Sequence, residues 1–128
     1  MSFPCSAVRN LALAALLACT PATLTSGHAY IDTSSPADAS TVPPPREAIL
    51  KFTENVELEF STIAVKSPAG EVMSVGRVRQ PAPNTLSVDL KLLPPGPYTI
   101  EWRVLSVDTH ITDGILRFTV APAGRRGP

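Results

Sequence analysis

The chain has 128 residues, with 11 basic and 11 acidic side chains and only 2 cysteines. This balanced charge gives no reason to expect nucleic acid or an anionic membrane surface as a partner. Both cysteines, Cys5 and Cys19, precede residue 28, so a domain that starts there has no thiol for a disulfide, a thiolate metal site or a nucleophile.

Residues 1–27 are predicted to be a signal peptide. The basic Arg9 is followed by an apolar run at residues 11–18. That run is too short to span a bilayer as a helix of about 20 residues, but it is typical of an export signal. Small residues at positions 25–27 favour cleavage before His28. We therefore expect an exported protein whose mature chain starts at His28.

A lipoprotein is the alternative outcome of export. Residues 16–19 (LLAC) resemble a bacterial lipidation box in which Cys19 is the anchored residue. A chain anchored at Cys19 would keep His28 internal and without a free α-amine. The two outcomes therefore leave different chemistry at His28.

Beyond residue 27, turn residues alternate with short runs of strand length, and no segment keeps a helical period. Proline lacks the N–H of a sheet ladder and glycine adopts positive φ, so clusters of these residues predict turns. The clusters lie at 35–38, 43–45, 67–70, 81–84 and 94–97. The predicted strands lie at 48–53, 56–60, 63–66, 71–75, 85–90, 98–104 and 115–120.

The clearest period-two pattern lies in the run at 98–104, whose apolar residues share one face. Trp102 belongs to this face, and we predict that it packs in the core rather than touching a ligand. About seven short strands predict an all-β fold, either a Greek-key β-barrel or an immunoglobulin-like β-sandwich. We expect one domain at 28–120 and a disordered tail at 121–128.

Asp108 and His110 follow the run at 98–104 and form a candidate half of a metal site. On an extended segment, residues i and i+2 point to the same side, about 6.5 to 7 Å apart at Cα, so both side chains can reach one ion. Residues 111–114 (ITDG) are then expected to form a turn into the last strand. A surface histidine that is hydrogen-bonded to a nearby carboxylate is the alternative interpretation.

His28 is the only other histidine in the chain, and it would be the first residue of the cleaved protein. An N-terminal histidine offers its α-amine and its imidazole to the same ion. Together with Asp108 and His110 it supplies three nitrogens and one oxygen. Cu(II) prefers such a tetragonal donor set and binds to it more tightly than other divalent ions do. The pattern therefore predicts one Cu(II) ion at His28, Asp108 and His110.

The stretches His28–Ala29, 35–38, 50–56 and 98–110 resemble, in order and spacing, the CopC copper resistance family of bacterial periplasmic proteins. The resemblance covers 28–120 and implies a Greek-key β-barrel. It also implies that Cu(II) is bound by the amine and imidazole of His28 and by the matching Asp108 and His110.

Three further expectations follow from this resemblance. Glu54 is similar to a family glutamate near the copper, and we expect it in the second shell, where it would hold a water or a ligand nitrogen. A second, Cu(I) site in a methionine-rich loop is not expected, because residues 61–84 contain only Met73. Ile111 stands where the family often has proline, which affects the expected shape of the loop but not the ligands.

The leading functional hypothesis is a non-enzymatic periplasmic Cu(II) protein that buffers copper or delivers it to a CopD-type inner-membrane protein, with no small-molecule substrate. One alternative is a copper-dependent oxidative enzyme with an N-terminal histidine brace, like lytic polysaccharide monooxygenases. A coordinating carboxylate should hinder its redox cycling, and the chain has few aromatic residues for a sugar platform. The other alternative is a structural immunoglobulin-like domain in which both histidines are incidental.

Overall fold

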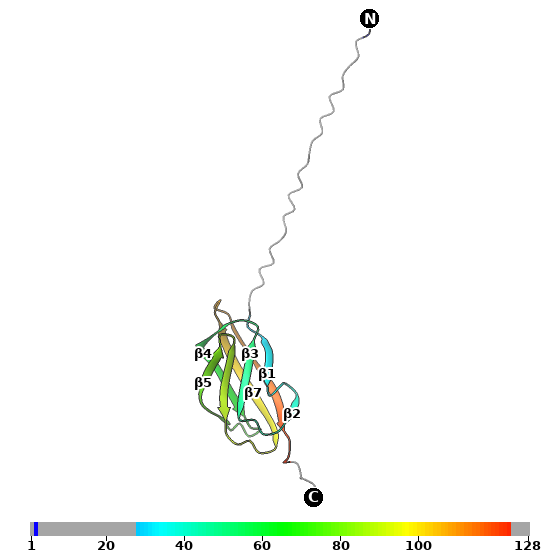
Figure 1. Cartoon of the computed structure of the whole chain (residues 1–128), viewed down its shortest axis with the longest axis vertical. Coiled ribbons are helices and arrows are strands. Elements are labelled where there is room, and N and C mark those ends of the chain that lie inside the picture. The colour runs from blue at the N-terminus through cyan, green and yellow to red at the C-terminus, as the bar shows by residue number, and fades with distance from the viewer. Residues whose placement is uncertain (1, 3–27, 124–128) are drawn as a thin grey trace.

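The computed structural model describes Ser2 and residues 28–123. The predicted signal peptide and the last five residues of the predicted tail therefore lie, apart from Ser2, outside the described residues. The described chain folds into eight β-strands that form two four-stranded sheets (Figure 1). No helix in residues 28–123 is long and apolar enough to cross a membrane.

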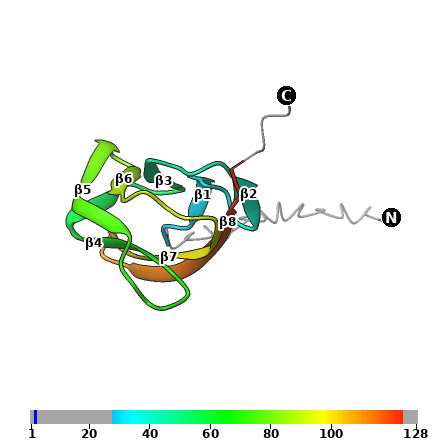
Figure 2. The same ribbon diagram turned by 90° about the horizontal axis from the view of Figure 1, so that it is seen from below.

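One sheet, in spatial order, contains β1 (Ile31–Ser35), β3 (Glu47–Phe52), β6 (Thr85–Leu90) and β5 (Ser74–Ala82). The other contains β2 (Ser40–Val42), β8 (Ile111–Val120), β7 (Gly96–Ser106) and β4 (Val56–Lys66). All neighbours pair antiparallel except β2, which runs parallel to β8. Seen along the strands, the sheets form two separate layers (Figure 2). The all-β prediction is confirmed, in its β-sandwich form rather than as a closed barrel.

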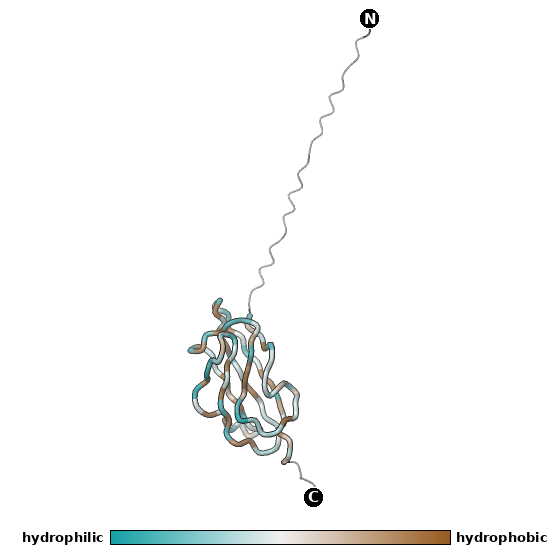
Figure 3. Tube along the Cα trace, viewed as in Figure 1, coloured by the Kyte–Doolittle hydropathy of each residue, from teal (hydrophilic) through white to brown (hydrophobic). Residues whose placement is uncertain are grey.

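Alternating side chains build the core between the two layers. Along β7, Tyr98, Ile100, Trp102 and Val104 are buried, while the intervening residues face outward. Figure 3 shows hydrophobic and hydrophilic residues interspersed along the strands. The ring of Phe52 meets that of Trp102 edge to face, with centroids 5.4 Å apart. The prediction that Trp102 packs in the core is confirmed.

The strands differ from the prediction in several places. The runs predicted at 56–60 and 63–66 form one strand, β4, because a bulge closed by a 2.7 Å hydrogen bond from Ser61 Oγ to the Glu57 carbonyl absorbs the extra residues. The strand predicted at 71–75 starts later, as β5, and continues through Pro81. β5 is an edge strand, so the missing N–H of that proline is tolerated. The short strands β1 and β2 lack the alternating pattern and were not predicted.

The turn predicted at 111–114 is wrong, because these residues form the first part of β8. Gly114 lies directly opposite Trp102 in the β7–β8 ladder. A Cβ atom on Gly114 would lie 2.7 Å from Cζ2 of the indole. The glycine therefore makes room for the tryptophan ring and does not mark a chain reversal.

The fold brings two distant segments to the same end of the sandwich. The turn between β7 and β8, residues 107–110, and the start of β1 both lie at the upper end in Figure 1, whereas β8 ends at the opposite end. β8 ends at Val120, and the N–H of the next residue, Ala121, bonds to the Val42 carbonyl at 2.8 Å.

Candidate metal centre

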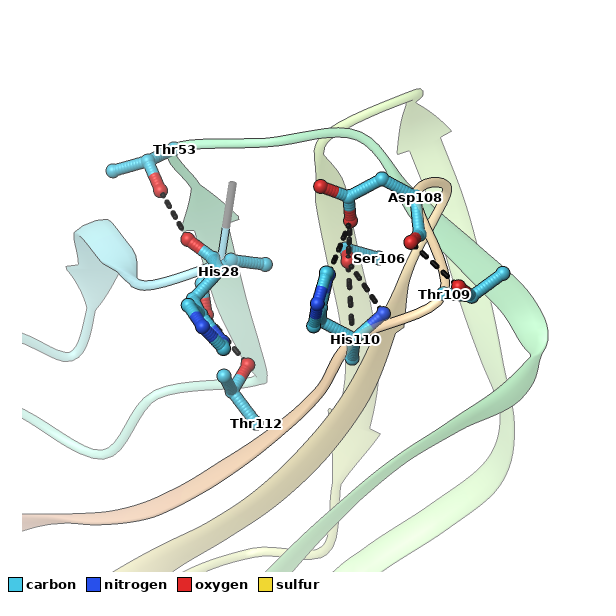
Figure 4. A network of polar contacts seen from close by, with 8 residues as sticks. His28, Thr53, Ser106, Asp108, Thr109, His110 and Thr112 are labelled. Carbon is cyan, nitrogen blue, oxygen red and sulfur yellow. Dashed lines mark hydrogen bonds and ion pairs between the residues drawn. The ribbon is translucent and has the colours of Figure 1, made fainter. Parts of the chain in front are cut away.

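His28 and His110 lie side by side at this end of the sandwich, with their rings tilted relative to each other. Their ring centroids are 4.8 Å apart and the ring planes are inclined at 55° (Figure 4). His28 precedes β1, and His110 is the last residue before β8. The structure thus brings together the only two histidines of the sequence, from opposite ends of the domain.

Asp108 lies beside His110 on the same turn. Its Oδ1 is 3.4 Å from Nδ1 of His110, and each side chain is 45% exposed. Asp108 and His110 are close for a different reason than predicted, because their segment is a tight turn and not an extended strand. Thr109 has a φ of 71°, and its N–H bonds to the Ser106 carbonyl at 2.9 Å, so the turn itself brings the two side chains together.

Ser106 is a further member of this turn that was not predicted. Ser106 is only 1% exposed. Its hydroxyl donates a hydrogen bond to Oδ1 of Asp108 and accepts one from the N–H of His110 at 3.2 Å. Ser106 continues the buried series of β7 after Val104. A polar residue at a core position needs a hydrogen-bond partner, and this signal could have identified it from the sequence.

These contacts set the protonation of Asp108. The hydrogen bond from Ser106 lowers the pKa of Asp108 below its ordinary value, partial desolvation opposes this shift, and the hydrogen bond and charge of His110 add to it. A hydrogen bond to the charged form of a carboxyl favours that form. Asp108 is therefore a carboxylate at neutral pH and is available to a cation.

The segment that carries His28 is held by two hydroxyl groups. Thr112 Oγ1, on β8, donates to the Ala29 carbonyl at 2.6 Å. Thr53 Oγ1, after β3, accepts from the Tyr30 N–H at 3.0 Å and makes a longer contact of 3.5 Å with the His28 carbonyl (Figure 4). Ala29 is completely buried and His28 is half-buried.

Glu54, the predicted second-shell residue, and Met73, for which no role at the metal was expected, both lie outside this cluster. Glu54 directly follows Thr53 but is exposed, and within residues 28–123 it makes no hydrogen bond or ion pair. Its second-shell role stays a prediction. Met73 is 7% exposed and belongs to the hydrophobic core, so its thioether is not presented to solvent.

The donors fit a divalent ion only after a small rearrangement. Among the described residues, no three histidine, cysteine, aspartate or glutamate side chains already form a group that could hold a metal. Oδ1 of Asp108 is engaged by Ser106 and by Nδ1 of His110. Rotation of Asp108 and His110 would free one carboxylate and one imidazole, and these with the His28 imidazole are donors that first-row divalent ions accept. The α-amine of His28 joins them only once the preceding peptide bond is cut.

Comparisons with known proteins agree with this picture. The family described as CopC domain matches residues 31–121. Protein YobA of Escherichia coli K12 is 33% identical over 97 residues, which cover 73% of this chain and 78% of that protein. Copper resistance protein C of Xanthomonas campestris pv. juglandis is 33% identical over 101 residues, 73% and 80% of the two chains. The crystal structure of CopC from Methylosinus trichosporium OB3b superposes with a TM-score of 0.71 at 31% identity, covering 78% of this chain and all of that one.

Proposed function

The chain belongs to the CopC family, and on this premise we propose that it is a periplasmic protein that binds one Cu(II) ion and buffers or delivers copper. Relatives named as copper resistance proteins support a role in copper resistance. The ligands expected for such a role are His28, Asp108 and His110, and the second-shell role of Glu54 stays a prediction.

The observation that carries this proposal is the pair of histidine rings 4.8 Å apart, with the Asp108 carboxylate 3.4 Å from one of them. Two imidazoles and one carboxylate could serve several divalent ions. Cleavage before His28 would add the α-amine, giving the nitrogen-rich tetragonal set that favours Cu(II). Selective Cu(II) binding therefore depends on cleavage of the peptide bond before His28. We propose that the copper is then delivered to a CopD-type membrane protein.

The test is copper titration of the exported protein. Intact mass of the secreted chain first establishes whether it starts at His28. We expect one equivalent of Cu(II), with nitrogen coupling in the electron paramagnetic resonance spectrum. His28→Ala and His110→Ala should each weaken binding severely, whereas Glu59→Gln, which removes an exposed carboxylate on β4, should not. No stoichiometric uptake by protein starting at His28 would overturn the proposal.

The same preparation separates a carrier from an oxidative enzyme. A carboxylate ligand stabilises Cu(II) against reduction, so the copper-loaded protein should produce no sustained hydrogen peroxide with ascorbate and oxygen. Free copper at the same concentration provides the control. Sustained turnover above that control would favour the enzyme hypothesis.

A further inference from the structure

The segment before β1 is tied to the fold, because Ala29 is completely buried. Its carbonyl accepts a 2.6 Å hydrogen bond from Thr112 Oγ1 across 83 residues of sequence. A buried carbonyl without such a partner would cost free energy, so this hydroxyl decides whether Ala29 can stay buried.

Thr112 also occupies a particular place relative to the two histidines. It lies on β8 two residues after His110, pairs with Val104 in the ladder and is half-buried. Its partner Ala29 is the residue next to His28. One hydrogen bond thus connects Ala29, the neighbour of His28, to β8, the strand that begins directly after His110 (Figure 4).

We propose that Thr112 is a positioning residue for copper: its hydroxyl docks the segment at Ala29 so that His28 faces His110 before any ion arrives. This inference rests on the proposed Cu(II)-binding function. A docked segment reduces the conformational entropy that is lost on binding, and the ion then meets both halves of the site together. Without this hydrogen bond the segment keeps only its contacts with Thr53, so His28 meets His110 and Asp108 less often and binds an ion less tightly.

Thr112→Val tests this role, because it removes the hydroxyl, keeps the shape and suits a strand. In protein starting at His28 we expect Cu(II) affinity to fall about 10- to 100-fold, the range seen when outer-shell partners are lost. The spectrum of the bound ion should change toward that of His110→Ala. Thr112→Ser, which restores the hydroxyl, should recover both. Thr119→Val is the matched control, because Thr119 is an exposed threonine of β8 whose hydroxyl makes no hydrogen bond within the described chain.

A metal-free measurement keeps this role separate from overall folding. The nuclear Overhauser effect between the ring protons of His28 and His110 should be present in the wild type and in Thr112→Ser, and absent in Thr112→Val, while thermal unfolding confirms that each variant folds. Wild-type affinity and spectrum in Thr112→Val would overturn the positioning role alone. Failure of the wild type to take up Cu(II) would instead overturn the proposed function.

Discussion

The two halves of the candidate copper site are held by different means. Asp108 and His110 belong to one turn, whose shape is fixed by the β7–β8 ladder and by the buried hydroxyl of Ser106. His28 lies before the first paired residue of β1, and its segment depends on the Thr53 and Thr112 hydroxyls. The turn is thus complete when the hairpin folds, whereas the position of His28 depends on contacts from distant strands, and the proposed amine ligand would require cleavage of the chain as well.

A protein that starts at Gly27 instead of His28 should show the largest change in Cu(II) affinity. Only the His28 half of the site should be affected. The extra residue moves the free amine away from His28, so the ion loses a direct ligand. We expect Cu(II) affinity to fall by more than the 10- to 100-fold that loss of an outer-shell partner costs. Competition titration with a chelator of known affinity measures this. Unfolding of the metal-free protein should not change, and unchanged affinity would show that the amine is not a ligand.

Gly114→Ala should destabilise the β7–β8 hairpin, which carries Asp108 and His110. The added Cβ would lie 2.7 Å from Trp102 Cζ2, so the indole or the strand must move. Overpacking of this kind costs about 1–3 kcal/mol in the free energy of unfolding, measured by urea denaturation. Ile115→Ala, at an exposed neighbour, should change it by less than about 0.5 kcal/mol. Equal stability of the two variants would contradict the packing role of Gly114.

Gly114 also shows why the sequence predicted the fold only in part. The strands β3, β6 and β7 carry enough alternation to be recognised locally. A glycine after Thr112 and Asp113, however, is compatible with a turn as well as with a close contact. Only the cross-strand partner, Trp102, distinguishes the two, and strand pairing cannot be derived from a local pattern.

The candidate site was predictable to a similar extent. Asp108 and His110 could be found because they are close in sequence, and His28 because it follows the predicted leader. Ser106 could have been found as a polar residue in a buried series. Thr112 gave no such signal, because the partner of its hydroxyl lies 83 residues away.

Ser106→Ala should loosen the turn half while leaving the His28 segment docked. The change leaves the N–H of His110 and one oxygen of Asp108 without their partner. Loss of the hydrogen bond to the part-buried N–H of His110 costs about 0.5–1.5 kcal/mol, whereas the exposed oxygen of Asp108 can bond to water instead. Chemical unfolding at neutral pH measures the loss, and Ser40→Ala, whose hydroxyl bonds only to a nearby exposed turn carbonyl, is the matched control.

The loss in Ser106→Ala should also depend on pH. The hydrogen bond from Ser106 lowers the pKa of Asp108 in the folded protein. A lowered pKa stabilises the fold above the unfolded value of about 3.9, and the stabilisation disappears as the pH falls through the folded value. The difference between wild type and Ser106→Ala should therefore be larger at neutral pH than near pH 2. Equal differences at both values would show that the carboxylate is not the group Ser106 stabilises.

Thr109→Gly should cause the smallest change in the free energy of unfolding, and it should stabilise the fold where the other variants destabilise it. Thr109 adopts a φ of 71°, a conformation that is costly for a β-branched residue but open to glycine. Relief of this strain should stabilise the fold by up to about 1 kcal/mol. Because Ser106 holds Asp108 and His110 directly, Cu(II) affinity should stay unchanged. Thr119→Gly, within β8, should destabilise instead, since glycine weakens a strand interior. A loss of affinity in Thr109→Gly would mean that the turn needs its threonine as well as its serine, and that the hairpin half is less self-sufficient than its hydrogen bonds indicate.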